Sequence, residues 1–239
     1  MAYKIHPLWY LERLVSPARH SITFPHPKVT LLSHHIPKTA GSSLRVAFAQ
    51  ALGRRHVYGV YANTGAAEMS SGQDIWVPRK ATILHGHFRP HPNHTKMFPN
   101  ALRAVWVRDP IERIWSLVGH LLSLKERHPH YELMKNSGLK ADLNSQESIV
   151  YEMITTNVLN EFTKTYSSYF SAVPIENFSF VGSKHSFEQD LNRLSDMAAV
   201  SLKMLSINRR SDQSQPIPAK IRRLETYLRN EYEIVGDYL

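Results

Sequence analysis

The sequence contains no cysteine, which excludes disulfides, thiolate metal sites and a cysteine nucleophile. It also has no run of about 18 apolar residues, so no membrane-spanning helix is predicted. Charged residues make up 21% of the chain and no low-complexity tract interrupts it, a composition that argues against intrinsic disorder. A chain of 239 residues can bury a substantial core, and we predict a single globular domain over residues 1–239.

The first residues lack the features of a secretory signal. The segment MAYKIHPLWYLERLV has no uninterrupted apolar stretch, because Glu12 and Arg13 break it, and it has no small-residue cleavage site. We therefore expect a soluble, cytoplasmic protein.

Basic residues outnumber acidic residues by 29 to 20, which gives a formal net charge of +9 at pH 7. The 14 histidines would add positive charge under mildly acidic conditions, because free histidine titrates near pH ~6.5. This balance of charge indicates an acidic partner.

Short apolar segments alternate with segments of helical periodicity along the chain. Strands are predicted at residues 28–35, 57–61, 81–85, 103–107 and 178–181, and helices at 42–52, from 110, at 146–162, from 187 and at 218–231. Strands that alternate with helices indicate an α/β fold with a three-layer parallel sheet. Residues 125–145 are polar and predict an excursion from this core, in which substrate specificity is expected to lie.

Local signals mark where three of the helices begin or end and which faces they bury. Asp109, Pro110 and Glu112 predict a helix start with an N-cap and a capping box, and residues 186–189 (SFEQ) predict a second capping box. Gly53 is expected to end the helix predicted at residues 42–52. The spacing predicts three buried stripes, made of Leu44, Ala47, Phe48, Ala51 and Leu52; of Ile111, Ile114, Trp115, Val118 and Leu122; and of Phe187, Leu191 and Leu194.

Residues 35–44 (HIPKTAGSSL) place a lysine and small hydroxyl residues between a strand and a helix N-terminus. Backbone N–H groups and the positive end of the helix dipole attract anions at such a junction, and Gly41 allows close backbone approach. The pattern differs from a nucleoside triphosphatase loop, because Lys38 precedes the glycine instead of following it. An ordinary capped helix would use the same residue types, so the loop alone leaves both interpretations open.

Residues 107–117 (VRDPIERIWSL) place Arg108 at the carboxyl end of a predicted strand and Ser116 two turns along the next helix. Ligands of open α/β sheets bind outside these strand ends, so Arg108 is expected to face the same crevice as the Lys38 loop. Its planar guanidinium group suits a terminal phosphate monoester. The alternative is a surface ion pair between Arg108 and Asp109 or Glu112.

These two segments, together with FSFVGSKHSFEQDLNRL (178–194), resemble the carbohydrate sulfotransferases that use 3′-phosphoadenosine 5′-phosphosulfate, PAPS. The resemblance covers most of the chain and implies a P-loop-like strand–loop–helix phosphate site. It implies a 5′-phosphosulfate site made of Lys38, Thr39, Ala40, Gly41, Ser42 and Ser43, and a 3′-phosphate site made of Arg108 and Ser116. Residues 207–215 (INRRSDQSQ) stand where the family often closes a basic loop over the nucleotide, so Arg209 and Arg210 are further candidates, with solvated charge as the alternative.

Residues 85–87 (HGH) resemble the HGH of the uronyl and heparan sulfate 2-O-sulfotransferase branch, where a histidine is proposed as the base. Neutral imidazole suits removal of the proton from an acceptor hydroxyl. We predict His87 as the base and His85 as its supporter. His34 and His35 are assigned to packing or backbone hydrogen bonding.

The resemblance implies in-line transfer of a sulfuryl group from PAPS to a hydroxyl, with adenosine 3′,5′-bisphosphate (PAP) as product and no metal. The basic residues around the histidines (Arg79, Lys80, Arg89 and Lys96) favour an anionic glycan such as a uronic-acid polymer. A small lipid, an oligosaccharide or a secondary metabolite stays open as the acceptor. The sequence lacks the membrane anchor, stem and cysteines of the animal enzymes, which indicates a bacterial enzyme.

Three other functions fit part of the sequence. The four histidines of HGHFRPHPNH (85–94) suggest a metal site, but no acidic ligand accompanies them. A P-loop nucleotide or sugar kinase needs a lysine after its loop glycine and an acidic magnesium ligand, for which Asp109 is the candidate. A nucleic-acid-binding module explains the positive charge but leaves the paired motifs unexplained.

Overall fold

The computed structural model describes residues 7–15, 25–203 and 216–239. Its contacts divide the chain into two compact units, residues 1–107 with 170–208 and residues 108–169 with 209–239. The segment 207–215, with Arg209 and Arg210, lies outside the described residues. None of the described helices is long and apolar enough to cross a bilayer.

The first unit is built on a five-stranded sheet in which each neighbouring pair of strands is parallel. The strand order is β2-β3-β1-β4-β5. The strands are β1 (Leu31–His34), β2 (Val57–Val60), β3 (Ile83–Gly86), β4 (Leu102–Val107) and β5 (Phe180–Ser183). The predicted α/β fold with a parallel sheet is therefore confirmed, and each strand lies within two or three residues of its predicted position.

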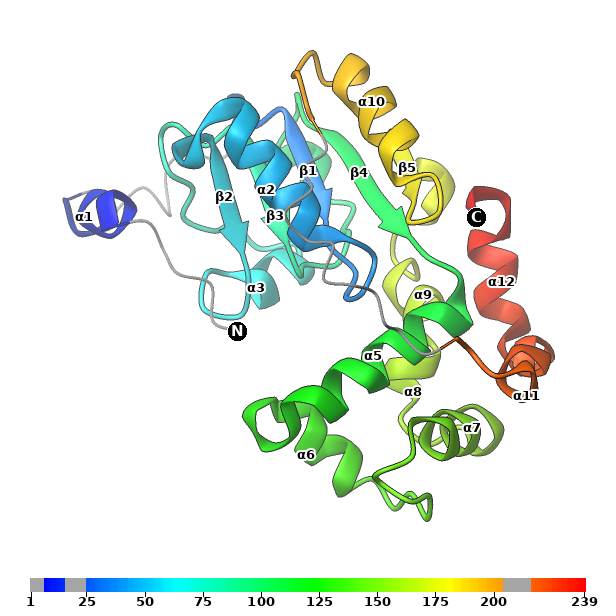
Figure 1. The fold of residues 1–239 in the computed structure, drawn as a ribbon. Helices are drawn as coiled ribbons and strands as arrows, with labels where there is room; N and C mark the ends of the chain where they lie inside the picture. Colours follow the sequence, from blue (N-terminus) through cyan, green and yellow to red (C-terminus); the bar gives the residue numbers. More distant parts are fainter. Residues whose placement is uncertain (1–6, 16–24, 204–215) are drawn as a thin grey trace. The chain divides into compact units, whose positions relative to one another are not determined.

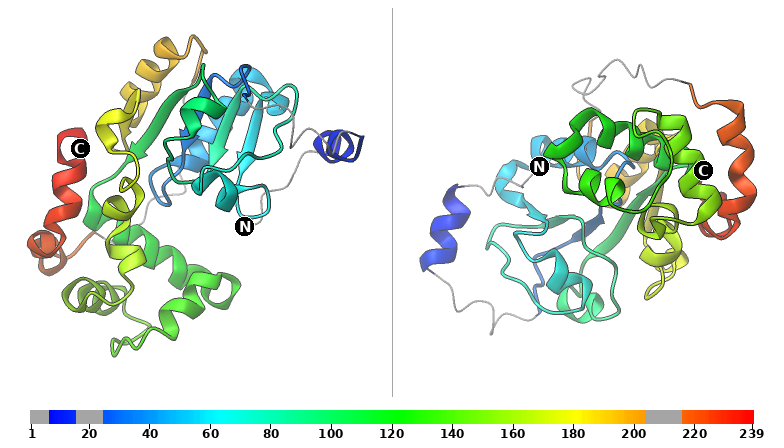
Figure 2. Two further views of the ribbon diagram at one scale, coloured as in Figure 1. Left: turned by 180° about the vertical axis from the view of Figure 1, so that it is seen from behind. Right: turned by 90° about the horizontal axis from the view of Figure 1, so that it is seen from below.

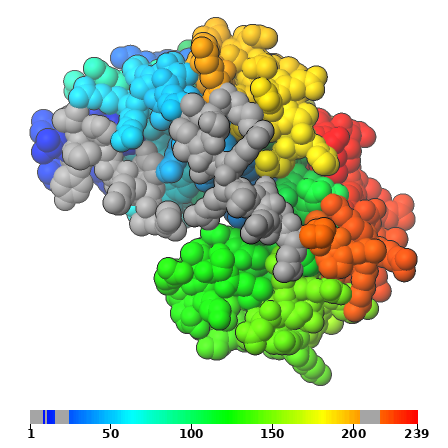
Figure 3. All heavy atoms as spheres, viewed as in Figure 1, coloured from blue at the N-terminus to red at the C-terminus, as the bar shows by residue number. Residues whose placement is uncertain are grey.

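Both faces of this sheet are covered, because successive residues of a strand point to opposite sides. On one face Leu31 and Trp106 pack with α2 (Gly41–Leu52) and α10 (Phe187–Met197), which lie in front of the sheet in Figure 1. On the other face Leu32 and Leu84 pack with α3 (Ala66–Ser70) and α4 (His94–Met97), seen from behind in Figure 2. The outer sides of α2 and α10, light blue and yellow in Figure 3, form part of the surface. The unit also contains α1 (Pro7–Val15) and 3-10 helices at Arg54–His56 and Ile175–Asn177.

The two helices that cover the front face follow the predicted stripes with two corrections. Leu44, Ala47 and Phe48 of α2 are buried, but Ala51 is exposed and Leu52 half-buried, because the last turn before Gly53 reaches the surface. The predicted stripe of α10 is confirmed, since Phe187, Leu191 and Leu194 are buried.

The capping box predicted at residues 186–189 is wrong. Ser186 makes no side-chain cap, and its hydroxyl donates instead to Asp190 at 2.7 Å. The same Asp190 oxygen accepts the N–H of Ser183 at 2.7 Å. The carboxylate of Asp190, four residues along the chain, therefore accepts the hydroxyl that the pattern assigns to the helix cap.

The second unit is helical in the residues that the structure describes. Its helices are α5 (Pro110–Leu124), α6 (Pro129–Lys135), α7 (Gln146–Thr156), α8 (Asn160–Thr163), α9 (Thr165–Tyr169), α11 (Ala219–Arg222) and α12 (Arg229–Val235), with 3-10 helices at Lys125–Arg127, Arg223–Leu228 and Gly236–Tyr238. Asp109 caps α5 by accepting the N–H of Glu112 at 2.8 Å, which confirms the predicted helix start. Its stripe is buried from Ile111 to Val118, whereas Leu122 is half-buried.

Two long helices predicted in this unit are shorter in the structure. The helix predicted at 146–162 ends at Thr156, because Asn157 (φ 57°) and Leu159 (φ 62°) adopt left-handed backbone conformations. The helix predicted at 218–231 is divided into α11, a 3-10 helix and α12. The polar residues 125–145 include α6, whose Tyr131 and Met134 are buried in the core of the unit.

Candidate active site

The HGH segment lies at the carboxyl end of β3, where three backbone contacts hold it. A Cβ on Gly86 would overlap with the carbonyl group of Val60 in β2, so only glycine permits this approach of the strands. The N–H of His87 donates to that same Val60 carbonyl at 2.9 Å. From the other side, the N–H of His35 donates to the Gly86 carbonyl at 2.8 Å. The two predicted histidines and His35 therefore meet at the ends of neighbouring strands.

His85 is fully buried and faces Ser33, its register partner on β1. Its Nδ1 lies 2.9 Å from the Ser33 hydroxyl, and its Nε2 lies near the Gly41 backbone without making a hydrogen bond. Burial, with a smaller effect of nearby positive groups, lowers the pKa of His85 to about 3. The side chain is thus neutral at physiological pH and closed off from solvent.

His87 is exposed, and two aromatic rings flank its imidazole. The ring of His35 stacks on it, with centroids 4.3 Å apart and planes 26° apart. The ring of Tyr61, just after β2, meets it edge-on at 5.0 Å. Of the two histidines in HGH, only His87 is presented to a solvent-borne substrate.

The loop before α2 has an unusual backbone and no side-chain cap. Lys38 (φ 73°) and Ala40 (φ 79°) both adopt left-handed conformations, which cost roughly 1–2 kcal/mol each for residues with a Cβ. Ala40 occupies the N-cap position and has no side chain that can cap the helix. The hydroxyl of Thr39 is buried and donates to the carbonyl of Ile36 at 2.8 Å. The ordinary capped helix that the sequence left open is therefore not what forms.

The remaining loop residues face different environments. Ser42 is exposed, and Lys38 and Ser43 are half-buried. Gly41 is buried against His35, since a Cβ at position 41 would overlap with the imidazole ring. From the sequence His35 is expected only to pack or to make backbone hydrogen bonds, and Tyr61 is not expected at the site, because the sequence offers no signal for it. The signal that points to His35 is its position between β1 and the loop before α2.

In the second unit, the backbone of Arg108 is fixed by Tyr166. The buried tyrosine hydroxyl accepts the Arg108 N–H at 2.9 Å and donates to the Arg108 carbonyl at 2.6 Å. Burial raises the pKa of Tyr166 to about 12, so the hydroxyl keeps its proton. The Arg108 side chain forms the ion pair that was the alternative to phosphate binding, with its Nε 3.3 Å from Glu112. Ser116 is half-buried on α5 in the same unit.

Asp109 uses both of its carboxylate oxygens within the second unit. One oxygen accepts the Glu112 N–H and a 3.3 Å contact from Arg222, and the other accepts the Tyr232 hydroxyl at 3.0 Å. Arg222 also donates a hydrogen bond to Glu112 at 2.7 Å. Burial raises the pKa of Glu112, but the hydrogen bonds and charges of Arg222 and Arg108 outweigh it and lower the pKa. Asp109 is thus a helix cap held in an ion-pair network.

The histidines of residues 85–94 do not converge. His94 is buried and its Nε2 lies 2.8 Å from the Met69 carbonyl, while His85 faces Ser33 and His87 stacks on His35. Within residues 7–15, 25–203 and 216–239, no group of three His, Cys, Asp or Glu residues is placed to hold a metal ion.

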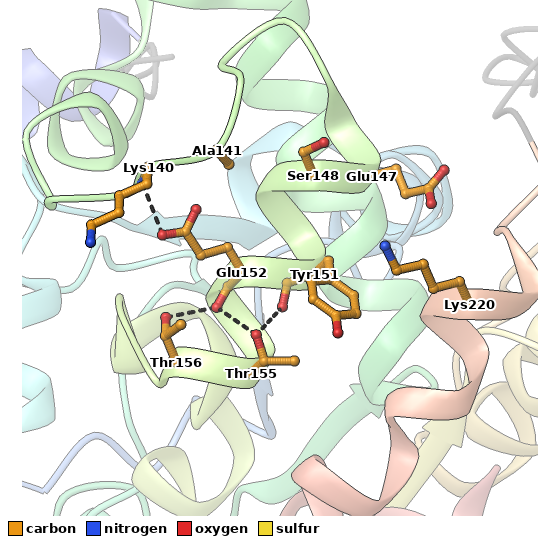
Figure 4. Close-up of a pocket in the computed structure, with 9 residues that line it drawn as sticks. All are labelled: Lys140, Ala141, Glu147, Ser148, Tyr151, Glu152, Thr155, Thr156 and Lys220. Atoms are coloured by element: carbon orange, nitrogen blue, oxygen red, sulfur yellow. Dashed lines mark hydrogen bonds between the residues drawn. The ribbon is translucent and has the colours of Figure 1, made fainter.

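Figure 4 shows a pocket of about 380 Å³ on the second unit. Its walls carry Tyr151, with the Lys220 ammonium 4.1 Å from the ring centroid, and Glu152, which accepts the Lys140 N–H at 2.8 Å. The pocket includes Lys140 and Ala141 of the polar segment 125–145, but none of the residues assigned to the donor, the acceptor proton or the nucleotide lines it.

No family model matches the chain, and no curated protein matches it. Among solved structures, the chain is similar to mouse sulfotransferase SULT7A1 complexed with PAP, at 8% identity and a TM-score of 0.39. The match covers 86% of this chain but spans only 65% of the mouse chain. At this level the similarity carries no conclusion about activity.

We expect the protein to lose stability steeply in mild acid. Burial lowers the pKa of His34, His35 and His85, and it lowers the pKa of His94 to about 4. These histidines therefore stay unprotonated in the folded state at pH values below ~6.5, where the unfolded chain binds protons. The free energy of unfolding should then fall by about 1.4 kcal/mol per pH unit for each such histidine as pH drops from 6.5 towards 4. Urea unfolding at pH 7, 6 and 5 measures this slope.

His94→Gln serves as the internal control for this slope. Glutamine can still donate to the Met69 carbonyl but does not titrate, so the variant should be less pH-sensitive than the wild type. An unfolding free energy that stays constant from pH 7 to pH 5 would contradict the burial of neutral histidines.

Proposed function

We propose that the chain is a PAPS-dependent sulfotransferase that moves a sulfuryl group to an acceptor hydroxyl. The observation that carries the proposal is the meeting of the loop before α2 and an exposed histidine at the carboxyl ends of β1 and β3. Gly41 at the start of α2 contacts His35, and His35 stacks on His87. Ligands of parallel α/β sheets bind at this edge.

The Lys38 loop is proposed as the site of the 5′-phosphosulfate. The uncapped start of α2 supports this assignment, because its first N–H groups and the helix dipole favour an anion. The left-handed residues Lys38 and Ala40 also support it, since strained backbone of this kind collects at ligand sites. We assign the binding contacts to Lys38, Thr39, Ala40, Gly41, Ser42 and Ser43.

Arg108 and Ser116 are proposed for the 3′-phosphate, as the resemblance implies. The phenol of Tyr166 fixes the Arg108 backbone on both sides, which supports a role that needs a defined guanidinium position. The Glu112 carboxylate holds the guanidinium in the structure, and a phosphate dianion would compete with it as a stronger bidentate partner.

His87 is proposed as the general base. Its exposed imidazole takes the proton of the acceptor hydroxyl while the acceptor oxygen forms a bond to sulfur, and the bond from sulfur to the bridging oxygen of PAPS breaks. Lys38 and the α2 N-terminus stabilise the negative charge that grows on that bridging oxygen. The products are the sulfated acceptor, PAP and a proton held by His87.

The acceptor is proposed to be an anionic glycan. Arg79, Lys80, Arg89 and Lys96 are all exposed, and they belong to the same unit as His87. Exposed lysine and arginine raise the local concentration of an anionic polymer by long-range attraction.

The kinase alternative finds no support in the second unit. Asp109, its candidate magnesium ligand, caps α5 and is bound by Arg222 and Tyr232. Asp109 would first have to give up its hydrogen bonds with Arg222 and Tyr232 before it could bind a metal ion.

PAP should raise the melting temperature far more than AMP does, because Arg108 and Ser116 are assigned to the phosphate that AMP lacks. Arg108→Ala should abolish the difference between the two nucleotides without unfolding the protein. Arg223→Ala, which removes an exposed arginine of the same unit, is the control and should leave the difference unchanged. Equal shifts with PAP and AMP in the wild-type protein would contradict the assignment.

A further inference from the structure

His35 lies between the anion-binding loop and the exposed histidine. One side of its ring is pressed against Gly41, where a Cβ would overlap with it. The ring stacks on His87 at 4.3 Å and on the buried His85 at 5.2 Å. Its backbone N–H donates to the Gly86 carbonyl at 2.8 Å, which ties it to the centre of the HGH segment.

The chemistry of this ring suits a contact role and not a reactive one. Its Nδ1 is buried without a hydrogen-bond partner among the described residues. Burial, followed by the repulsion that a protonated ring would meet from protonated His87 or His85, lowers the pKa of His35 well below its usual value. The ring is therefore a neutral, flat surface beside a histidine that must gain and lose a proton.

We propose that His35 is a positioning residue that holds the His87 imidazole by stacking and ties its position to Gly41 at the donor loop. The inference rests on the proposed function, because it gives a role to a residue beside the proposed base. The ring of Tyr61 also contacts His87, edge-on at 5.0 Å, so two rings pack against the imidazole. A nucleotide that moves the start of α2 would move His35 and, through it, His87.

A simple filler role would require only volume at position 35, whereas positioning requires a flat ring. His35→Phe keeps a planar face, and His35→Leu fills similar space without one. Transfer of labelled sulfate from PAPS to desulfated heparin is the activity probe. Because small misplacements of reacting groups cost up to ~10²-fold in rate, His35→Leu should lower kcat by roughly 10- to 100-fold with the KM for PAPS unchanged. His35→Phe should retain most of the wild-type kcat.

Equal kcat values for the two variants, or a wild-type kcat for His35→Leu, would overturn the proposal. A fall in kcat that is matched by loss of the PAP-induced thermal shift would also overturn it, because the fold or the donor site would then be damaged.

A second readout does not depend on catalysis. In histidine-labelled protein the NMR signals of the His87 ring, identified with His87→Gln, should carry a ring-current shift that His35→Leu removes and His35→Phe preserves. PAP should move these signals in the wild type but not in His35→Leu. If PAP binds the wild type and the His87 signals are the same in His35→Leu, the inference alone is wrong. If PAP does not bind the wild type, the proposed function fails and the inference fails with it.

Discussion

His87→Ala is expected to lower the rate of sulfuryl transfer by ~10²–10⁴-fold, the usual cost of removing a general base. The side chain is exposed at the carboxyl end of β3, where it can reach an acceptor hydroxyl, and it is not among the residues assigned to the donor. PAP binding should therefore stay normal while turnover falls. The fall in rate at low pH, which arises from protonation of the base, should be absent in His87→Ala. Steady-state kinetics and PAP calorimetry on the same preparation measure both effects.

His85→Asn is the matched control, because asparagine can keep the contact with Ser33 while removing the second imidazole. A histidine that is fully buried and has a pKa of about 3 cannot reach the acceptor, so this variant should keep the fall in rate at low pH. If His87→Ala turns over normally and His85→Asn does not, His85 is the base and our choice of histidine is wrong. If both turn over normally, another group takes the acceptor proton.

Lys38→Ala should lower kcat by roughly 10²–10³-fold, the size of effect expected when a single group that stabilises transition-state charge is lost. The ammonium is most important when the bridging oxygen becomes anionic, so kcat should fall more than the affinity for PAP. Lys28→Ala removes the same charge from an exposed site in the same unit and is the matched control. A normal kcat for Lys38→Ala would remove the lysine from the mechanism.

The same assay separates this chemistry from metal-assisted transfer. PAPS has no β- and γ-phosphates that require neutralisation by magnesium, so turnover should survive a strong chelator. Loss of activity on chelation, with recovery on adding zinc or magnesium, would favour the histidine-rich metal site or the kinase.

The sequence predicts those parts of the fold that short-range patterns determine. The alternation of strands and helices predicts the parallel sheet. Asp109, Pro110 and Glu112 predict the start of α5, because an N-cap acts within three residues. The pattern fails where a different local arrangement competes with the expected one. The Ser186 hydroxyl goes to Asp190, and left-handed Asn157 ends α7 early.

At the candidate site, too, the sequence predicts some features and not others. The loop before α2 and the HGH segment could be found by motif, since their chemistry is written in consecutive residues. The different environments of His85 and His87 could not, because residues two apart on a strand share a face. The difference depends on the end of β3 at Gly86 and on the approach of Val60 to Gly86. The stack of His35 on His87 joins the residues that follow β1 and β3, and no spacing rule predicts such a contact.

The most direct test of the proposed function compares PAP with ATP in the presence of magnesium. Thermal unfolding of the wild-type protein is measured with each nucleotide at the same concentrations. A PAPS-dependent sulfotransferase should be stabilised by PAP in proportion to the logarithm of its concentration above Kd, and much less by ATP with magnesium. Stabilisation by ATP with magnesium and none by PAP would contradict the account.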